Sequence, residues 1–172
     1  MFFPNRFAMI IEQPSTLLRL LYPGALWRIN PEEKAVYLTF DDGPSNNTQD
    51  ILDILAEKQV KATWFVMGSS DQFGMVKDIW GAGHQVAVHT SSHNYNAIYA
   101  SAEAYWADFD ATAAKIKEQL NITPTLFRFP GGSINDFNRS VRDQIFEEAA
   151  QKHLHYFDWN VDSTDASGEN VP

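Results

Sequence analysis

The fold of this chain is decided by the stretch AVYLTFDDGP, residues 35–44. Its first six residues are rich in β-branched and aromatic side chains, which favours a strand. The strand ends at Asp41 and Asp42, and the Gly-Pro pair that follows them is typical of a turn. Two adjacent carboxylates at a strand end repel each other unless a cation offsets their charge. The stretch therefore predicts a strand whose end carries chemistry, with one carboxylate able to bind a metal ion while its neighbour faces the metal's water.

Outward from this stretch, strand and helix patterns alternate regularly along the chain. Five strands are predicted with four helices between them, and such alternation indicates an α/β fold of parallel βαβ units. A doubly wound sheet and a (β/α) barrel both fit this rhythm, and periodicity does not separate them. The predicted strands are 35–40, 62–67, 85–89, 125–129 and 154–159, and the predicted helices are 48–58, 71–80, 101–120 and a last one that follows residues 134–136 and ends near Lys152.

The first 34 residues lack this rhythm. Pro14 followed by the run 15–21 predicts a short amphipathic helix. We therefore interpret residues 1–34 as an N-terminal segment docked on a single domain at 35–172. No segment approaches the roughly 18 apolar residues of a membrane-spanning helix. The apolar run at 7–11 is too short for the core of an export signal, so no such signal is visible in the chain.

Composition narrows the possible ligands. The formal net charge is −9, and an acidic body repels phosphate groups, so nucleic acid and anionic membranes are poor partners. The chain has no cysteine, which excludes disulfides, iron–sulfur clusters and thiolate zinc sites. Any metal ion must therefore be held by histidine and carboxylate side chains.

A pair of histidines is the strongest candidate for such a site. His89 and His93 stand four residues apart, a common spacing for metal ligands, at the end of the third predicted strand. Because the carboxyl ends of parallel strands converge on one rim, we expect Asp42 to lie beside them. Two histidines and one aspartate leave open positions for water and substrate. Zinc commonly occupies such a site, although the same ligands also suit a non-haem Fe(II) oxygenase.

Two more polar clusters lie at the carboxyl ends of the fourth and fifth predicted strands. Arg128 can pair with a carboxylate at the rim and hold its orientation. The Gly-Gly pair after it can turn a backbone N–H towards a developing oxyanion. The run 158–165 contains three aspartates and Trp159, which suits polar support for the site and a platform on which a sugar ring stacks.

Together these clusters resemble the polysaccharide deacetylases, the NodB homology domain of carbohydrate esterase family 4. The resemblance runs from about Val36 to Asp165 and rests on four strings in order: TFDDGP at 39–44, HTSSH at 89–93, RFPGG at 128–132 and DSTD at 162–165. It implies a distorted (β/α) barrel. It further implies substrate contacts at Pro130 and Gly131, beside Trp159.

The resemblance also assigns roles. Asp41 would be the catalytic base, and Arg128 the residue that tethers it. The metal ligands would be Asp42, His89 and His93, and the metal Zn²⁺ or another divalent transition metal such as Co²⁺. Asp165 would be the acid that tunes a catalytic histidine.

The sequence departs from the family pattern at three points. Gly131 stands where an aromatic residue is usual, and Ala166 stands where a tryptophan is usual. The Leu-x-His motif that supplies the family's general acid does not occur before Pro172. We therefore expect a C-terminally truncated domain, an incomplete barrel, and a fifth strand whose outer edge is unpaired.

The function implied is metal-dependent removal of N-acetyl groups from a GlcNAc-containing polysaccharide, such as peptidoglycan or a chitin-like chain. By resemblance, such a protein acts in the bacterial cell envelope or outside the cell. One alternative is a catalytically weakened domain that keeps the metal site and binds glycan. An Fe(II) oxygenase is the other, and the α/β pattern disfavours it, because those enzymes normally have a β-rich fold.

Overall fold

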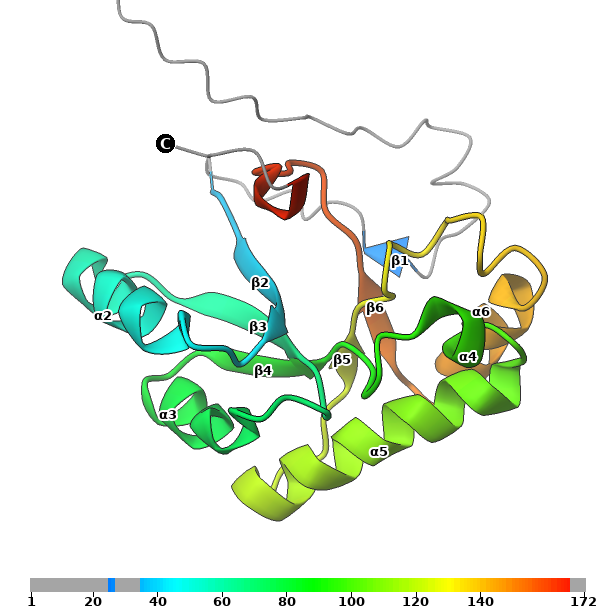
Figure 1. Ribbon diagram of the computed structural model, residues 1–172, viewed down its shortest axis with the longest axis horizontal. Helices are drawn as coiled ribbons and strands as arrows, with labels where there is room; N and C mark the ends of the chain where they lie inside the picture. The colour runs from blue at the N-terminus through cyan, green and yellow to red at the C-terminus, as the bar shows by residue number, and fades with distance from the viewer. Residues whose placement is uncertain (1–24, 27–34, 168–172) are drawn as a thin grey trace, which may run out of the picture.

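The computed structural model describes residues 25–26 and 35–167. They form a parallel sheet with helices around it (Figure 1). The strands are β1 (Ala25–Leu26), β2 (Leu38–Gly43), β3 (Ala62–Val66), β4 (Gln85–Val88), β5 (Leu126–Phe127) and β6 (His155–Phe157). The helices are α2 (Thr48–Lys58), α3 (Val76–Gly81), α4 (Tyr95–Ile98), α5 (Ala102–Leu120) and α6 (Arg142–Gln151), with short 3₁₀ turns η1 (Phe73–Met75) and η2 (Asp165–Ser167).

The strand order is β1-β6-β5-β4-β3-β2, and every neighbouring pair is parallel. This confirms the predicted α/β architecture and brings all carboxyl ends to one rim. One expectation was wrong: the outer edge of the last strand is not unpaired. β1 pairs with β6, placing Ala25 opposite Tyr156 and Leu26 opposite Phe157. The helix predicted at 15–21 lies outside the described residues.

The sheet curls into an open half-barrel (Figure 1). Arg128 follows β5, and in a flat sheet β5 and β2 would lie about 14 Å apart, at roughly 4.8 Å per strand. Yet one guanidinium donates to Thr39 and Asp41 of β2 and also to the carbonyl of Phe157 in β6. The curl therefore brings strands that are not neighbours to within reach of a single side chain.

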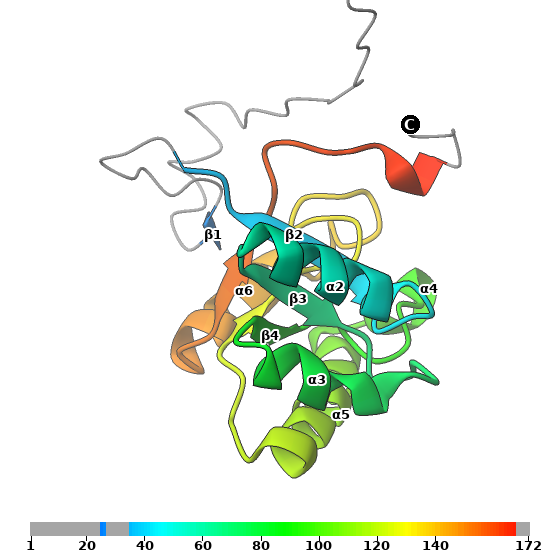
Figure 2. The same ribbon diagram turned by 90° about the vertical axis from the view of Figure 1, so that its left-hand side faces the viewer.

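The longest helix anchors the fold through one apolar face. Its residues Tyr105, Phe109, Thr112 and Ile116 recur at helical spacing and are all buried. Ser101 caps its first turn by accepting a hydrogen bond from the Ala104 N–H at 3.0 Å. α5 packs with α3 against β4 on the outer side of the curl (Figures 1 and 2). No helix among the described residues is long and apolar enough to cross a membrane.

Two of the predicted helices differ clearly from the structure. The helix expected at 71–80 divides into η1 and α3. The helix expected soon after residue 136 begins only at Arg142. The Asn135 side chain accepts hydrogen bonds from the backbone N–H groups of Phe137 and Asn138, at 2.8 and 3.0 Å. A side chain that bonds nearby backbone in this way competes with the helical pattern, so the segment forms an ordered loop instead.

Candidate metal centre

Three side chains meet at the rim where β2 and β4 end. A carboxylate oxygen of Asp42 lies 3.3 Å from Nε2 of His89 and 3.3 Å from Nε2 of His93. Two ligand atoms bound tetrahedrally to zinc at about 2.0–2.1 Å are themselves about 3.3–3.4 Å apart. The spacing of these donor atoms therefore fits a divalent metal ion, and the cluster is the set that the sequence predicted.

The ring of His89 is oriented from behind. Its Nδ1 lies 2.9 Å from the carbonyl oxygen of Arg128, and the side chain is 3% exposed. A carbonyl oxygen only accepts hydrogen bonds, so Nδ1 carries the proton. In the neutral ring, Nε2 is then left with a lone pair directed at Asp42. This arrangement is the usual support for a histidine that ligates a metal.

The backbone at the cluster is held in an unfavourable conformation. Asp42, Thr90 and His93 have φ angles of 63°, 64° and 52°, in the left-handed region that favours glycine. Each such residue costs on the order of 1 kcal/mol or more, and strain of this kind gathers at functional sites. The surrounding structure must therefore hold the turn that carries the two histidines.

That support comes from two polar residues of α5 that the sequence analysis did not identify. The carboxylate of Asp108 accepts hydrogen bonds from the backbone N–H groups of Ser91 and Ser92. The hydroxyl of Thr112 donates to the carbonyl of Thr90 at 2.8 Å. A threonine on the apolar face of a helix was the one signal in the sequence that pointed to this role.

The charges of the cluster favour the forms that bind metal. A hydrogen bond from a doubly protonated His89 ring lowers the pKa of Asp42, and the positive charges of His89 and His93 act in the same direction, while burial opposes them. Burial lowers the pKa of His93 below 6.5, even though Asp42 acts in the opposite direction. An ionised carboxylate and a neutral imidazole are the ligand forms that a metal ion requires.

Beside the cluster, the second carboxylate of the pair is held by a buried arginine. Nη1 of Arg128 donates to Oδ1 of Asp41 at 2.8 Å; the Asp41 side chain is 29% exposed and the arginine 3%. The guanidinium also donates to the carbonyls of Phe157 and Asp158. Asp41 thus remains accessible at the rim while its orientation is fixed, which is the requirement for a positioned base.

The guanidinium also lies over two aromatic rings. Its carbon atom is 4.2 Å from the centroid of Phe65 and 5.5 Å from that of Trp159. Trp159 is half-buried, and a Cβ on Gly132 would lie 3.4 Å from its ring. The ring that we predicted as a sugar platform therefore packs against Arg128 and against the glycine loop, residues 130–133.

The loop after Arg128 is fixed by side chains around its Pro130–Gly131 peptide. The carbonyl of Pro130 accepts hydrogen bonds from the Tyr99 hydroxyl at 2.7 Å and from the Asn135 amide at 3.2 Å. In a trans peptide the carbonyl and the N–H point in opposite directions, so the N–H of Gly131 is fixed as well. Further along, Asp158 accepts from both the N–H and the hydroxyl of Ser133.

Asp165 does not join this group. It is exposed in η2 and accepts a hydrogen bond from the hydroxyl of Ser163, and within 35–167 it makes no contact with the cluster. The other histidines lie at the opposite ends of strands: His84 precedes β4, and His153 and His155 mark the start of β6. The tuning role predicted for Asp165 stays a prediction.

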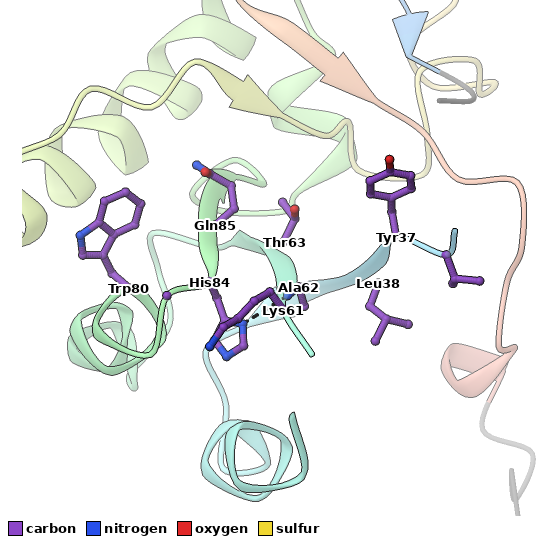
Figure 3. A pocket seen from close by; sticks show the side chains of 10 residues that line it. Tyr37, Leu38, Lys61, Ala62, Thr63, Trp80, His84 and Gln85 are labelled. Atoms are coloured by element: carbon purple, nitrogen blue, oxygen red, sulfur yellow. Dashed lines mark hydrogen bonds between the residues drawn. The ribbon is translucent and has the colours of Figure 1, made fainter. Parts of the chain in front are cut away.

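A pocket of about 420 Å³ also lies at that opposite end (Figure 3). Its lining comes from the amino ends of β2, β3 and β4 and includes Tyr37, Trp80 and His84. The Nδ1 of His84 is occupied, because it accepts a hydrogen bond from the N–H of Ala62 at 3.2 Å. Because its lining comes from the amino ends of the strands, this pocket is separate from the rim that carries the metal cluster.

The parallel half-barrel thus carries, on one rim, a two-histidine, one-aspartate cluster beside a tethered carboxylate. The polysaccharide deacetylase family model matches residues 28–151. The chain belongs to the polysaccharide deacetylase family.

Individual deacetylases are similar to this chain in sequence. A peptidoglycan-N-acetylglucosamine deacetylase of Bacillus cereus is 32% identical over 164 residues, which cover 94% of this chain and 57% of that protein. Chitin deacetylase 1 of Cryptococcus neoformans is 36% identical over 117 residues, covering 67% of this chain and 25% of that one. The chain thus spans little more than half the length of the first of these relatives and a quarter of the second.

Solved structures extend the similarity to the fold. The catalytic domain of a peptidoglycan N-acetylglucosamine deacetylase from Eubacterium rectale matches with a TM-score of 0.76 and 40% identity, covering 81% of this chain and 66% of that one. The polysaccharide deacetylase Bc1974 from Bacillus cereus matches with a TM-score of 0.72 and 30% identity, covering 81% of this chain and 66% of that one. These matches confirm the barrel-type fold over the alternative of a doubly wound sheet.

Proposed function

We propose that this chain removes N-acetyl groups from a GlcNAc-containing polysaccharide in a metal-dependent hydrolysis. The observation that carries the proposal is the juxtaposition, on one rim, of a three-ligand cluster and a separate carboxylate fixed by Arg128. Two adjacent aspartates thereby have different partners: Asp42 faces the histidines and Asp41 faces the arginine. Membership of the polysaccharide deacetylase family supports the same reaction.

The ligands of the proposed metal are Asp42, His89 and His93, and Zn²⁺ is our first choice, with Co²⁺ as a substitute. When bound, a divalent ion supplies Lewis-acid polarisation of the acetyl carbonyl and lowers the pKa of a nearby water. The chain's contribution is to present one carboxylate oxygen and two imidazole nitrogens on a strained, braced backbone. An Fe(II) oxygenase has no support from the fold or the family.

Asp41 is the proposed base. Its carboxylate takes a proton from the attacking water as the water oxygen bonds to the acetyl carbon. The protonated Asp41 then gives that proton to the sugar nitrogen as the C–N bond breaks, which releases acetate and leaves a free amine on the polymer. None of the three remaining histidines lies at the rim, so Asp41 serves both steps among the described residues.

The N–H of Gly131 is the proposed donor to the oxyanion. Its peptide is held through the Pro130 carbonyl by Tyr99 and Asn135, so the donor is preorganised and needs no rearrangement during the reaction. The backbone here has a φ of 75°, which glycine adopts without strain. The aromatic side chain that is usual at this position in the family is not needed for the N–H itself.

The polymer that we propose is peptidoglycan, or a chitin-like chain as the second choice. Relatives with 30–40% identity are named as peptidoglycan N-acetylglucosamine deacetylases or as chitin deacetylases. Peptidoglycan as substrate would place the reaction in the bacterial cell envelope or outside the cell.

Acetate release tests the proposal. Purified protein is stripped with a chelator, reloaded with Zn²⁺ or Co²⁺, and incubated with chito-oligosaccharides or with peptidoglycan. We expect acetate and free amine to appear in equal amounts only after reloading. A protein that binds the glycan and zinc but releases no acetate would instead be the weakened binding domain, and one that binds neither would exclude both functions.

A further inference from the structure

An aromatic row leads from the metal cluster to the surface. The ring of Tyr95, the first residue of α4, meets the His93 ring edge-on, with centroids 5.3 Å apart. The Tyr95 ring also meets the ring of Phe137, with centroids 4.9 Å apart. Phe137 belongs to the loop before α6 and is 55% exposed. The row therefore begins at a proposed metal ligand and ends in solvent.

The position of Tyr95 depends on the glycine loop. A Cβ added at Gly131 would lie 2.9 Å from Cε1 of Tyr95 and 3.0 Å from its hydroxyl oxygen. The first distance is shorter than real Cβ contacts and the second is among the tightest, so the tyrosine ring occupies the space that a side chain at 131 would need. The ring is thereby confined between His93 and the loop, and it supplies an aromatic surface where residue 131 has no side chain.

The position of Phe137 is fixed as well, although its ring is exposed. Its backbone N–H donates to the Asn135 side chain at 2.8 Å. The Asn135 amide in turn donates to the carbonyls of Pro130 and Gly132, at 3.2 and 2.9 Å. An exposed phenylalanine on a braced loop gains little from burial, and its ring is held in place beside a polar cluster. Such a surface suits a ligand with an apolar face.

We propose that Tyr95 and Phe137 form an aromatic platform that binds the pyranose ring of a GlcNAc unit whose acetamido group lies at the metal cluster. This proposal rests on the function proposed above and names the subsite that positions the substrate. The C–H face of a pyranose ring is apolar and carries partial positive charge, and the face of an aromatic ring carries partial negative charge. A GlcNAc unit is itself neutral, so the protein's net charge of −9 does not oppose its binding.

The platform differs from the one that the sequence predicted. Trp159 packs against Arg128 and Gly132 and is half-buried, so its ring supports the arginine that holds Asp41. The Phe137 ring is more exposed than that of Trp159, and the Tyr95 ring contacts a proposed metal ligand, His93. We therefore place the platform at Tyr95 and Phe137, and the sugar-stacking role predicted for Trp159 stays a prediction.

The test measures binding and turnover in the zinc-loaded protein with chitotetraose. Phe137→Ala removes an exposed ring and should leave the fold intact. We expect the Kd and KM to rise about 3- to 10-fold, the size of an aromatic contact, while kcat changes less than about twofold. Tyr95→Leu should give the same direction of change. Trp80→Ala is the matched control, because Trp80 is a 39% exposed aromatic residue at the opposite end of the strands.

Unchanged Kd and KM in both rim variants, with an active wild-type protein, would overturn the platform but leave the proposed function standing. A wild-type protein that binds chitotetraose without releasing acetate, and loses affinity in Phe137→Ala, would support the platform and overturn the activity. A wild-type protein that neither binds nor hydrolyses the sugar would overturn both.

Discussion

Asp108 should set the metal affinity of the rim without touching the metal. Its carboxylate accepts two backbone N–H groups of the turn between His89 and His93. A hydrogen bond to a charged group contributes about 1.5–3 kcal/mol, and water will replace part of the bond to the exposed Ser92. We therefore expect Asp108→Ala to lower the free energy of unfolding by about 2 kcal/mol. For a chain of this length, that corresponds to a Tm lower by roughly 4–8 °C.

The same change should weaken zinc binding about 10- to 100-fold, the usual effect of removing a residue that orients metal ligands. The assay is competition for zinc against a chromophoric chelator, with thermal unfolding of the metal-free protein measured in parallel. Asp108→Asn keeps an acceptor oxygen and should fall between the wild type and Asp108→Ala. Asp110→Ala, which removes an exposed carboxylate from the same helix, should change neither quantity. Wild-type zinc affinity in Asp108→Ala would refute the idea that α5 positions the histidines.

Three further predictions follow from the rim. Arg128→Lys keeps the charge but cannot reproduce the four hydrogen bonds of the guanidinium. We expect about a 10²-fold lower kcat, since misplacement of a reacting group has that effect; a kcat like that of the wild type would show that Asp41 needs no tether. The second prediction concerns pH. The pKa values of Asp42 and His93 are lowered in the fold, so their contribution to stability is present above their unfolded values and is lost as the pH falls. The Tm of the metal-free protein should accordingly fall more steeply below about pH 6.5, the ordinary pKa of histidine, in the wild type than in His93→Ala, and equal slopes would contradict the assignment. The third prediction compares two glycines with similar φ angles. Gly131→Ala and Gly132→Ala should both lower the Tm through backbone strain, and Gly131→Ala should lower it further because only its Cβ meets an atom at 2.9 Å. Equal Tm values would show that the neighbouring ring moves aside freely.

The spacing of apolar and polar residues along the sequence predicted the helices and strands that local interactions determine. The helix at 48–58 agrees with α2 at both ends, and the helix at 101–120 agrees with α5 apart from its cap Ser101. The strands at 62–67 and 85–89 were each one residue too long. Asp42, His89 and His93 could be grouped from sequence because parallel strands bring their carboxyl ends together whatever the details of the barrel.

The features that were missed depend on tertiary structure. β1 is only two residues long, and it is recognised as a strand through its pairing with β6, a contact that the local sequence does not reveal. The late start of α6 follows from one asparagine side chain that binds its own loop, a choice that apolar spacing does not report. The support that Asp108 provides also arises only when α5 packs beneath the histidine turn. Such contacts are invisible to any reading of a single segment.

The most direct test of the central claim separates the two neighbouring aspartates. Asp41→Asn and Asp42→Asn are each purified, loaded with zinc and measured for bound metal and for acetate release from chito-oligosaccharide. We predict that Asp41→Asn retains about one zinc ion and loses about 10²–10⁴-fold in rate, as expected for loss of a general base. Asp42→Asn should lose most of the metal and, with it, the activity. Loss of zinc in Asp41→Asn with retention in Asp42→Asn would contradict the assignment of base and ligand.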